Sequence, residues 1–98
     1  MFASEETKPL LAQEAASLEA TDYEALRDTY LDIEKSSERI GPDGTPHQLE
    51  VVAFWDDKPK GPLRVFVEVT PLRRGWRGGA GTDFIKPVPV EASPRPGN

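Results

Sequence analysis

The strongest constraint on the fold is a pair of apolar segments, residues 49–55 and 63–70, in which hydrophobic side chains recur at every second position. A period of two is that of a β-strand, whose successive side chains point to opposite faces, and the many valines favour the same conformation. The intervening residues 56–62 are polar and contain two prolines and one glycine. A strand, a polar loop and a second strand predict an antiparallel hairpin.

Both faces of this predicted hairpin carry apolar residues. Residues in phase with Leu49 and Leu63 form one face, and Val52, Phe54 and Phe66 form much of the other. An antiparallel sheet that buries a single face usually shows polar residues on the second. We therefore expect the second face to be covered by the N-terminal segment or by a partner, and a homodimer is one form that such a partner takes.

A helix is predicted over residues 22–36. Thr21 followed three residues later by Glu24 matches the capping box that begins many helices. Apolar residues then recur at steps of three and four, which places them along one face of a helix. These residues are Tyr23, Leu26, Tyr30 and Ile33. We interpret the two tyrosines as core residues rather than binding residues.

Together these elements predict an α+β fold, with one main N-terminal helix packed on a small antiparallel β-sheet and disordered termini. Beside the hairpin, residues 83–86 are expected to form a short third strand, and the proline-containing residues 86–90 an edge strand or a polyproline segment. We divide the chain into a flexible or weakly helical N-terminal segment (1–20), a single α+β domain (21–90) and a disordered tail (91–98). The predicted core is Leu26, Tyr30, Ile33, Leu49, Val51, Ala53, Leu63, Val65, Val67 and Val69, completed by Phe84 or Ile85.

Charge is distributed unevenly along the chain. Residues 1–50 hold twelve Asp or Glu against four Lys or Arg, a net charge of −8, whereas residues 51–98 hold five against eight, a net charge of +3. The acidic half suits a basic partner, and it also suits the basic half of the same chain. The interpretation we favour is that an exposed helix carries these acids for solubility.

The composition bears on the compartment as well. The chain has no cysteine, which excludes disulfides, thiolate metal sites and cysteine catalysis. Its longest apolar run, residues 51–55, is far shorter than the roughly 20 residues that span a bilayer. The acids near the N-terminus are also unlike a signal peptide. We expect a cytoplasmic protein with no membrane partner.

Few residues are suited to catalysis. His47, the single histidine, has no serine or acid at a spacing typical of a triad, and we interpret it as an exposed loop residue. Asp56 and Asp57 do not follow a calcium-loop spacing, and the glycines of residues 78–81 match no phosphate-binding pattern. We therefore predict no enzymatic activity, no cofactor and no metal site.

Residues 72–81 form the most distinctive binding motif, because they combine three arginines, one tryptophan and four glycines. Guanidinium groups pair with carboxylate or phosphate, and tryptophan and arginine are enriched among residues that dominate protein interfaces. We predict that Arg73, Arg74, Trp76 and Arg77 bind a partner. The alternative is a structural loop in which Trp76 folds back on the sheet and the arginines face water.

The predicted function is that of a small non-catalytic protein-binding module: an adaptor, an inhibitor or an immunity-like accessory protein that contacts another protein through this loop. Arg77-Gly78-Gly79 resembles one unit of the arginine-glycine-glycine boxes of RNA-binding tails. That resemblance implies the alternative of a small nucleic-acid-binding protein using the same loop. The net charge of −5 disfavours this alternative, because it repels phosphate.

Overall fold

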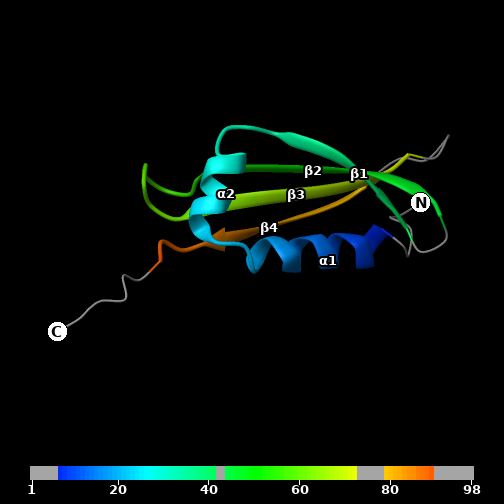
Figure 1. Ribbon diagram of the computed structural model, residues 1–98, viewed down its shortest axis with the longest axis horizontal. Coiled ribbons are helices and arrows are strands. Elements are labelled where there is room, and N and C mark those ends of the chain that lie inside the picture. Colours follow the sequence, from blue (N-terminus) through cyan, green and yellow to red (C-terminus); the bar gives the residue numbers. More distant parts are fainter. Residues whose placement is uncertain (1–6, 42–43, 73–78, 90–98) are drawn as a thin grey trace.

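The computed structural model describes residues 7–41, 44–72 and 79–89. Within this part, the elements are α1 (Thr7–Glu19), α2 (Tyr23–Tyr30), β1 (Lys35–Ile40), β2 (Pro46–Trp55), β3 (Leu63–Pro71) and β4 (Ala80–Lys86). The strands form one antiparallel sheet in the order β1-β2-β3-β4, so each strand pairs with the next along the chain (Figure 1). The predicted α+β fold with an antiparallel sheet is confirmed, and the sheet contains one strand more than the hairpin and edge strand.

The predicted hairpin forms the centre of the sheet. In β2 and β3, Trp55 lies opposite Leu63 and Val51 lies opposite Val67. The connecting loop closes with a hydrogen bond from the Asp56 N–H to the Pro62 carbonyl (2.9 Å). Because β1 and β4 flank the hairpin, both of its strands have a neighbour on each side, which satisfies their backbone donors and acceptors.

β4 is longer than the predicted strand near residues 83–86, because it begins at Ala80. It ends before Pro87, which cannot donate a ladder hydrogen bond. Gly79 precedes the strand at a very close approach to β3, where an added Cβ would lie 2.1 Å from the Val69 carbonyl oxygen. At least one glycine of this segment therefore serves the strand pairing rather than a binding loop.

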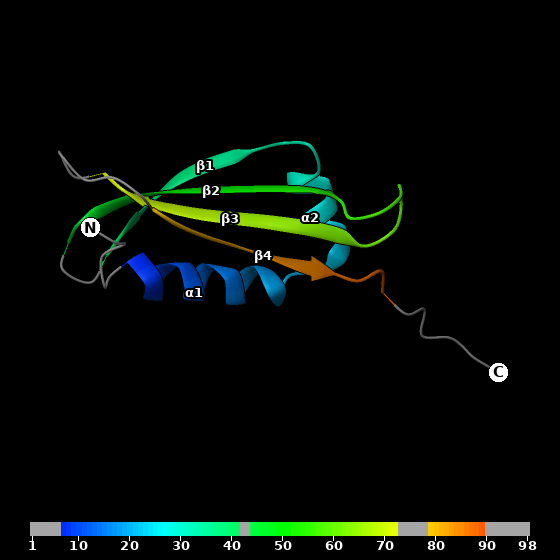
Figure 2. The same cartoon turned by 180° about the vertical axis from the view of Figure 1, so that it is seen from behind.

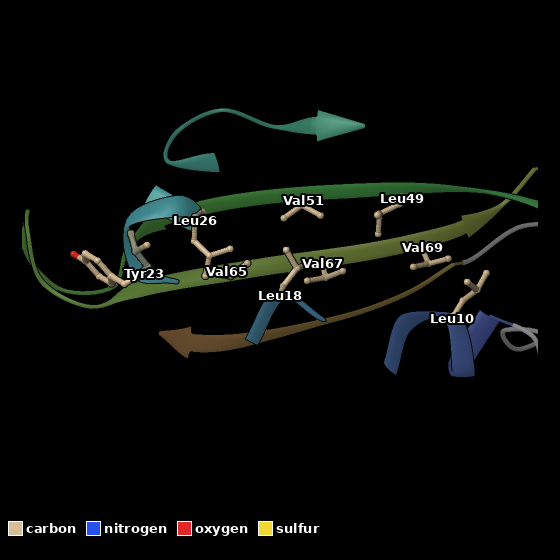
Figure 3. Close-up of a cluster of buried hydrophobic side chains, with 11 residues drawn as sticks. Leu10, Leu18, Tyr23, Leu26, Leu49, Val51, Val65, Val67 and Val69 are labelled. Atoms are coloured by element: carbon tan, nitrogen blue, oxygen red, sulfur yellow. The ribbon is translucent and has the colours of Figure 1, made fainter. Parts of the chain in front are cut away.

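Both helices pack on the same face of the sheet: α1 contacts β3 and β4, and α2 contacts β2 near the hairpin loop (Figure 1). The sequence pattern favours only a flexible or weakly helical segment up to residue 20. In the structure, Leu10 and Leu18 of α1 are buried among the valines of the sheet (Figure 3). Their spacing of eight residues places them on one helix face, so a thin apolar stripe suffices to dock α1 on a sheet face made mostly of Leu and Val side chains.

One buried cluster joins the helices to the sheet. The residues of the predicted core that lie in β2 and β3 are all buried, and so is Leu26 of α2. The buried strand residues are Leu49, Val51, Ala53, Leu63, Val65, Val67 and Val69. Tyr30 and Phe84 are partly buried at the margin of this cluster. Tyr23 joins the core as well, and its hydroxyl donates to the Gly61 carbonyl (2.6 Å), which ties α2 to the hairpin loop.

The predicted helix over residues 22–36 is wrong beyond the end of α2. Leu31 is extended and forms a bridge with Ala53, whose carbonyl accepts a hydrogen bond from the Asp32 N–H (2.8 Å). Asp32 has a left-handed φ of 58°, a conformation that cannot continue a right-handed helix. The chain then enters β1, and Ile33, predicted to be in the core, is 49% exposed.

The predicted capping box is also absent. Asp22 is the N-cap of α2 and makes no side-chain cap hydrogen bond. The Thr21 hydroxyl instead donates to the Ser17 carbonyl (2.9 Å) and so caps the end of α1. Glu24 remains in the first turn of α2, where its charge is favourable to the helix dipole. Because α1 ends only a few residues before α2 begins, Thr21 caps the C-terminus of α1 rather than the N-terminus of α2.

Candidate functional site

One face of the sheet points away from both helices, and we call it the open face. Buried and more exposed residues alternate along β2 and β3, which places their even-numbered residues on this face. Figure 2, seen from behind, shows these strands in front of α2. The strand register confirms that Val52, Phe54 and Phe66 share this face, and no helix of the described residues covers it.

The open face is aromatic near the hairpin loop. Phe54 and Phe66 are 44% and 40% exposed, and their rings meet edge to face with centroids 6.0 Å apart. Ile85 of β4, 39% exposed, lies opposite Arg64, which in turn lies opposite Phe54. Phe54, Phe66 and Ile85 therefore form an apolar patch that crosses β2, β3 and β4.

Arg64 lies between Phe54 and Ile85 across the strands, and its guanidinium group forms ion pairs with two aspartates. Its Nε donates to Asp56 Oδ1 (3.0 Å) and its Nη1 donates to Asp83 Oδ2. The hydrogen bonds that Arg64 donates to Asp83 and, to a smaller extent, to Asp56 raise the pKa of Arg64 above its ordinary value. Paired with two carboxylates, Arg64 offers little positive charge to an incoming phosphate.

The open face becomes acidic away from the hairpin loop. Glu50 of β2 lies directly opposite Glu68 of β3, and Glu34 immediately precedes β1. Burial raises the pKa of Glu50 above its ordinary value, and the charges of Glu34 and Glu68 and a side-chain hydrogen bond with Glu68 raise it further. Within the described part of the chain, none of these three carboxylates forms an ion pair with Lys or Arg.

An open hollow of about 300 Å³ lies where the apolar and acidic parts of this face meet. Val52 and Phe66 supply its apolar side, and Glu50 and Glu68 supply acidic groups. Gly81 lies opposite Glu68 and leaves space there because it has no side chain. We call this the acidic hollow; it is lined by Glu34, Glu50, Val52, Phe66, Val67, Glu68, Gly81, Thr82 and Asp83.

His47 is buried and structural, so its interpretation as an exposed loop residue is wrong. It lies in β2 with none of its surface exposed, on the face that the helices cover. Its Nδ1 donates to the Thr45 carbonyl (3.0 Å), and in the neutral ring Nε2 accepts from the Thr7 hydroxyl (3.2 Å). His47 thereby joins β2 to the first turn of α1.

The binding residues predicted from sequence, Arg73, Arg74, Trp76 and Arg77, lie outside the described residues. Their role therefore stays a prediction. The acidic hollow was not among the predicted sites, although both of its central carboxylates lie on the predicted hairpin.

Among the described residues, no three His, Asp or Glu side chains lie close enough together to hold a metal ion. Asp56, weighed in the sequence as a cation ligand, is instead paired with Arg64. Neither helix is long and apolar enough to cross a membrane, within the ranges that the structure describes.

Comparisons of the chain with protein families, with curated proteins and with solved structures found no match.

Proposed function

We propose that this protein is a small non-catalytic protein-binding module, of the adaptor or inhibitor kind, and that the open face is its binding surface. The observation that carries the proposal is the exposed pair of Phe54 and Phe66 on a sheet face that no described helix covers. Aromatic side chains supply large contact areas at low entropic cost and are enriched at protein interfaces. A face on which such side chains adjoin one another marks an interaction site.

The charges on the open face favour a protein over a nucleic acid. The acidic hollow presents carboxylates, and Arg64 is paired with Asp56 and Asp83. A nucleic acid would bring phosphates toward these negative groups at an unfavourable electrostatic cost. Nucleic-acid binding through the arginine-rich loop remains the alternative, and it predicts a steep loss of affinity with salt.

The test compares F54S/F66S with the control V88S in a pull-down followed by mass spectrometry. Val88 is 43% exposed but lies beyond β4, beside Tyr23 of α2 rather than on the open face. We expect proteins that bind the wild type and V88S to be absent from the F54S/F66S sample. Circular dichroism should show that all three chains are folded. If every captured protein also binds F54S/F66S, the open face is not the binding surface.

A further inference from the structure

The open face combines two kinds of surface that call for different groups from a partner. The patch around Phe54 and Phe66 calls for apolar side chains. The adjoining acidic hollow calls for a positive charge, because Glu50 and Glu68 lie opposite each other with no Lys or Arg paired to them in the described chain. Like charges directly opposite on neighbouring strands destabilise a sheet. A bound cation would turn this repulsion into attraction.

The chemistry of the cation follows from the walls of the hollow. Val52 and Phe66 form one wall, which is apolar. Glu50 and Glu68 lie two residues further along β2 and β3 on the same face of the sheet. Lys and Arg have this same division, with an apolar stem and a charged end. The hollow, at about 300 Å³, is at the lower limit of small-molecule sites, a size suited to one long side chain.

We propose that the acidic hollow receives one Lys or Arg side chain of the partner protein, with its stem against Val52 and Phe66 and its charged end between Glu50 and Glu68. This inference rests on the proposed function and adds the chemistry of the partner: a segment in which a basic residue adjoins apolar ones. Charge-assisted hydrogen bonds to two carboxylates would give such a residue both affinity and a fixed position. The apolar neighbours would cover Phe54 and Phe66.

A second copy of this chain fits the open face less well. In a two-fold symmetric dimer each copy presents the same surface to the other, so the carboxylates of the acidic hollow of one copy would be buried against a face of the same sign. The basic residues of the described open face do not relieve this, since Arg64 is held by Asp56 and Asp83. Charge complementarity therefore selects a basic partner.

The experiment selects binders from a displayed library of random peptides on the immobilised wild-type protein. The affinities of the enriched synthetic peptides are then measured for the wild type, E50Q/E68Q, F54S/F66S and the control E19Q/E24Q. Both glutamine doubles remove two negative charges, but Glu19 and Glu24 lie exposed on α1 and α2. The control thus separates the hollow from the general effect of net charge. Each peptide is also made with its basic residue replaced by norleucine.

We expect enriched peptides to share a Lys or Arg beside apolar residues and to bind E50Q/E68Q about tenfold more weakly than the wild type. The control E19Q/E24Q should bind within about twofold of the wild type. Replacement of the basic residue by norleucine should abolish the difference in peptide affinity between the wild type and E50Q/E68Q. Such coupling is the signature of a direct contact between the basic side chain and the two glutamates.

Two results would overturn the inference, and the first of them would leave the proposed function standing. In the first, peptides lose affinity for F54S/F66S but bind E50Q/E68Q as tightly as the wild type. In the second, sedimentation shows a wild-type dimer that F54S/F66S abolishes, which would identify a second copy as the occupant. Failure of the proposed function itself has a different signature, because no enriched peptide would then distinguish the wild type from F54S/F66S.

Discussion

Glu50 of β2 lies directly opposite Glu68 of β3, at the centre of the uncovered face of the sheet. The pKa of Glu50 is raised by its burial and by the charges of Glu34 and Glu68. A position that places two acids side by side lowers the stability of the isolated protein. Such a cost is typical of residues that serve binding rather than folding, because sites retained for function are often not optimal for stability.

The first prediction is that Glu50→Gln stabilises the protein at neutral pH. The folded-state pKa of Glu50 lies above its unfolded value. Between these two values the folded chain binds more protons, so the free energy of unfolding falls as pH rises through this interval. The substitution should raise the free energy of unfolding at neutral pH by up to about 1 kcal/mol. Below the ordinary glutamate pKa of 4.5 the difference should vanish.

Urea denaturation at neutral and acid pH measures this effect, with Glu24→Gln as the control because Glu24 is exposed on α2. The control should show no comparable gain. A Glu50→Gln protein that is less stable than the wild type at neutral pH would show that the carboxylate is favourably placed, contrary to the argument.

The second prediction concerns the buried histidine. His47→Ala removes the hydrogen bonds to Thr45 and Thr7 and leaves a cavity between β2 and α1. It should lower the free energy of unfolding by about 2–4 kcal/mol. Thr7→Val removes only the hydroxyl that meets His47 Nε2 and should cost about 1 kcal/mol. A His47→Ala protein as stable as the wild type would contradict the structural role.

The third prediction tests whether α1 is part of the folded domain. Leu18 is 8% exposed against the sheet, whereas Leu72, immediately after β3, is 45% exposed. Leu18→Ala should therefore lower the free energy of unfolding by about 2–3 kcal/mol, and the same substitution at Leu72 by about 0.5 kcal/mol or less. Equal costs in thermal or urea unfolding would mean that α1 contributes nothing to stability.

The hairpin could be predicted from sequence because its signal is local and repeated. Every second residue is apolar over residues 49–55 of β2 and 63–69 of β3, and a polar loop with prolines separates the strands. The pairing also follows from the loop: once Trp55 lies opposite Leu63, Glu50 must lie opposite Glu68. The pairing of Glu50 with Glu68 could therefore be predicted from the sequence. Its location on the sheet face that the helices leave uncovered could not.

The errors arose where contacts distant in sequence decide the structure. The helical spacing of Tyr30 and Ile33 is genuine, but Asp32 turns out of the helix to donate to Ala53 in β2. His47 has a polar neighbourhood in sequence, yet it lies in a strand whose inner face α1 covers. Which sheet face the helices cover depends on packing across the whole domain, and local pattern alone does not determine it.

The last prediction concerns the arginine-rich loop, whose binding role rests on sequence alone. The chain has two tryptophans, so Trp55→Phe leaves Trp76 as the single indole reporter. We expect its fluorescence to be quenched readily by iodide, as for a solvent-exposed side chain. Trp76→Ala should then change stability by only a few tenths of a kcal/mol and weaken partner binding by about 1–2 kcal/mol. Emission that resists quenching, together with a lower melting temperature of Trp76→Ala, would make the loop structural and leave the open face as the binding surface.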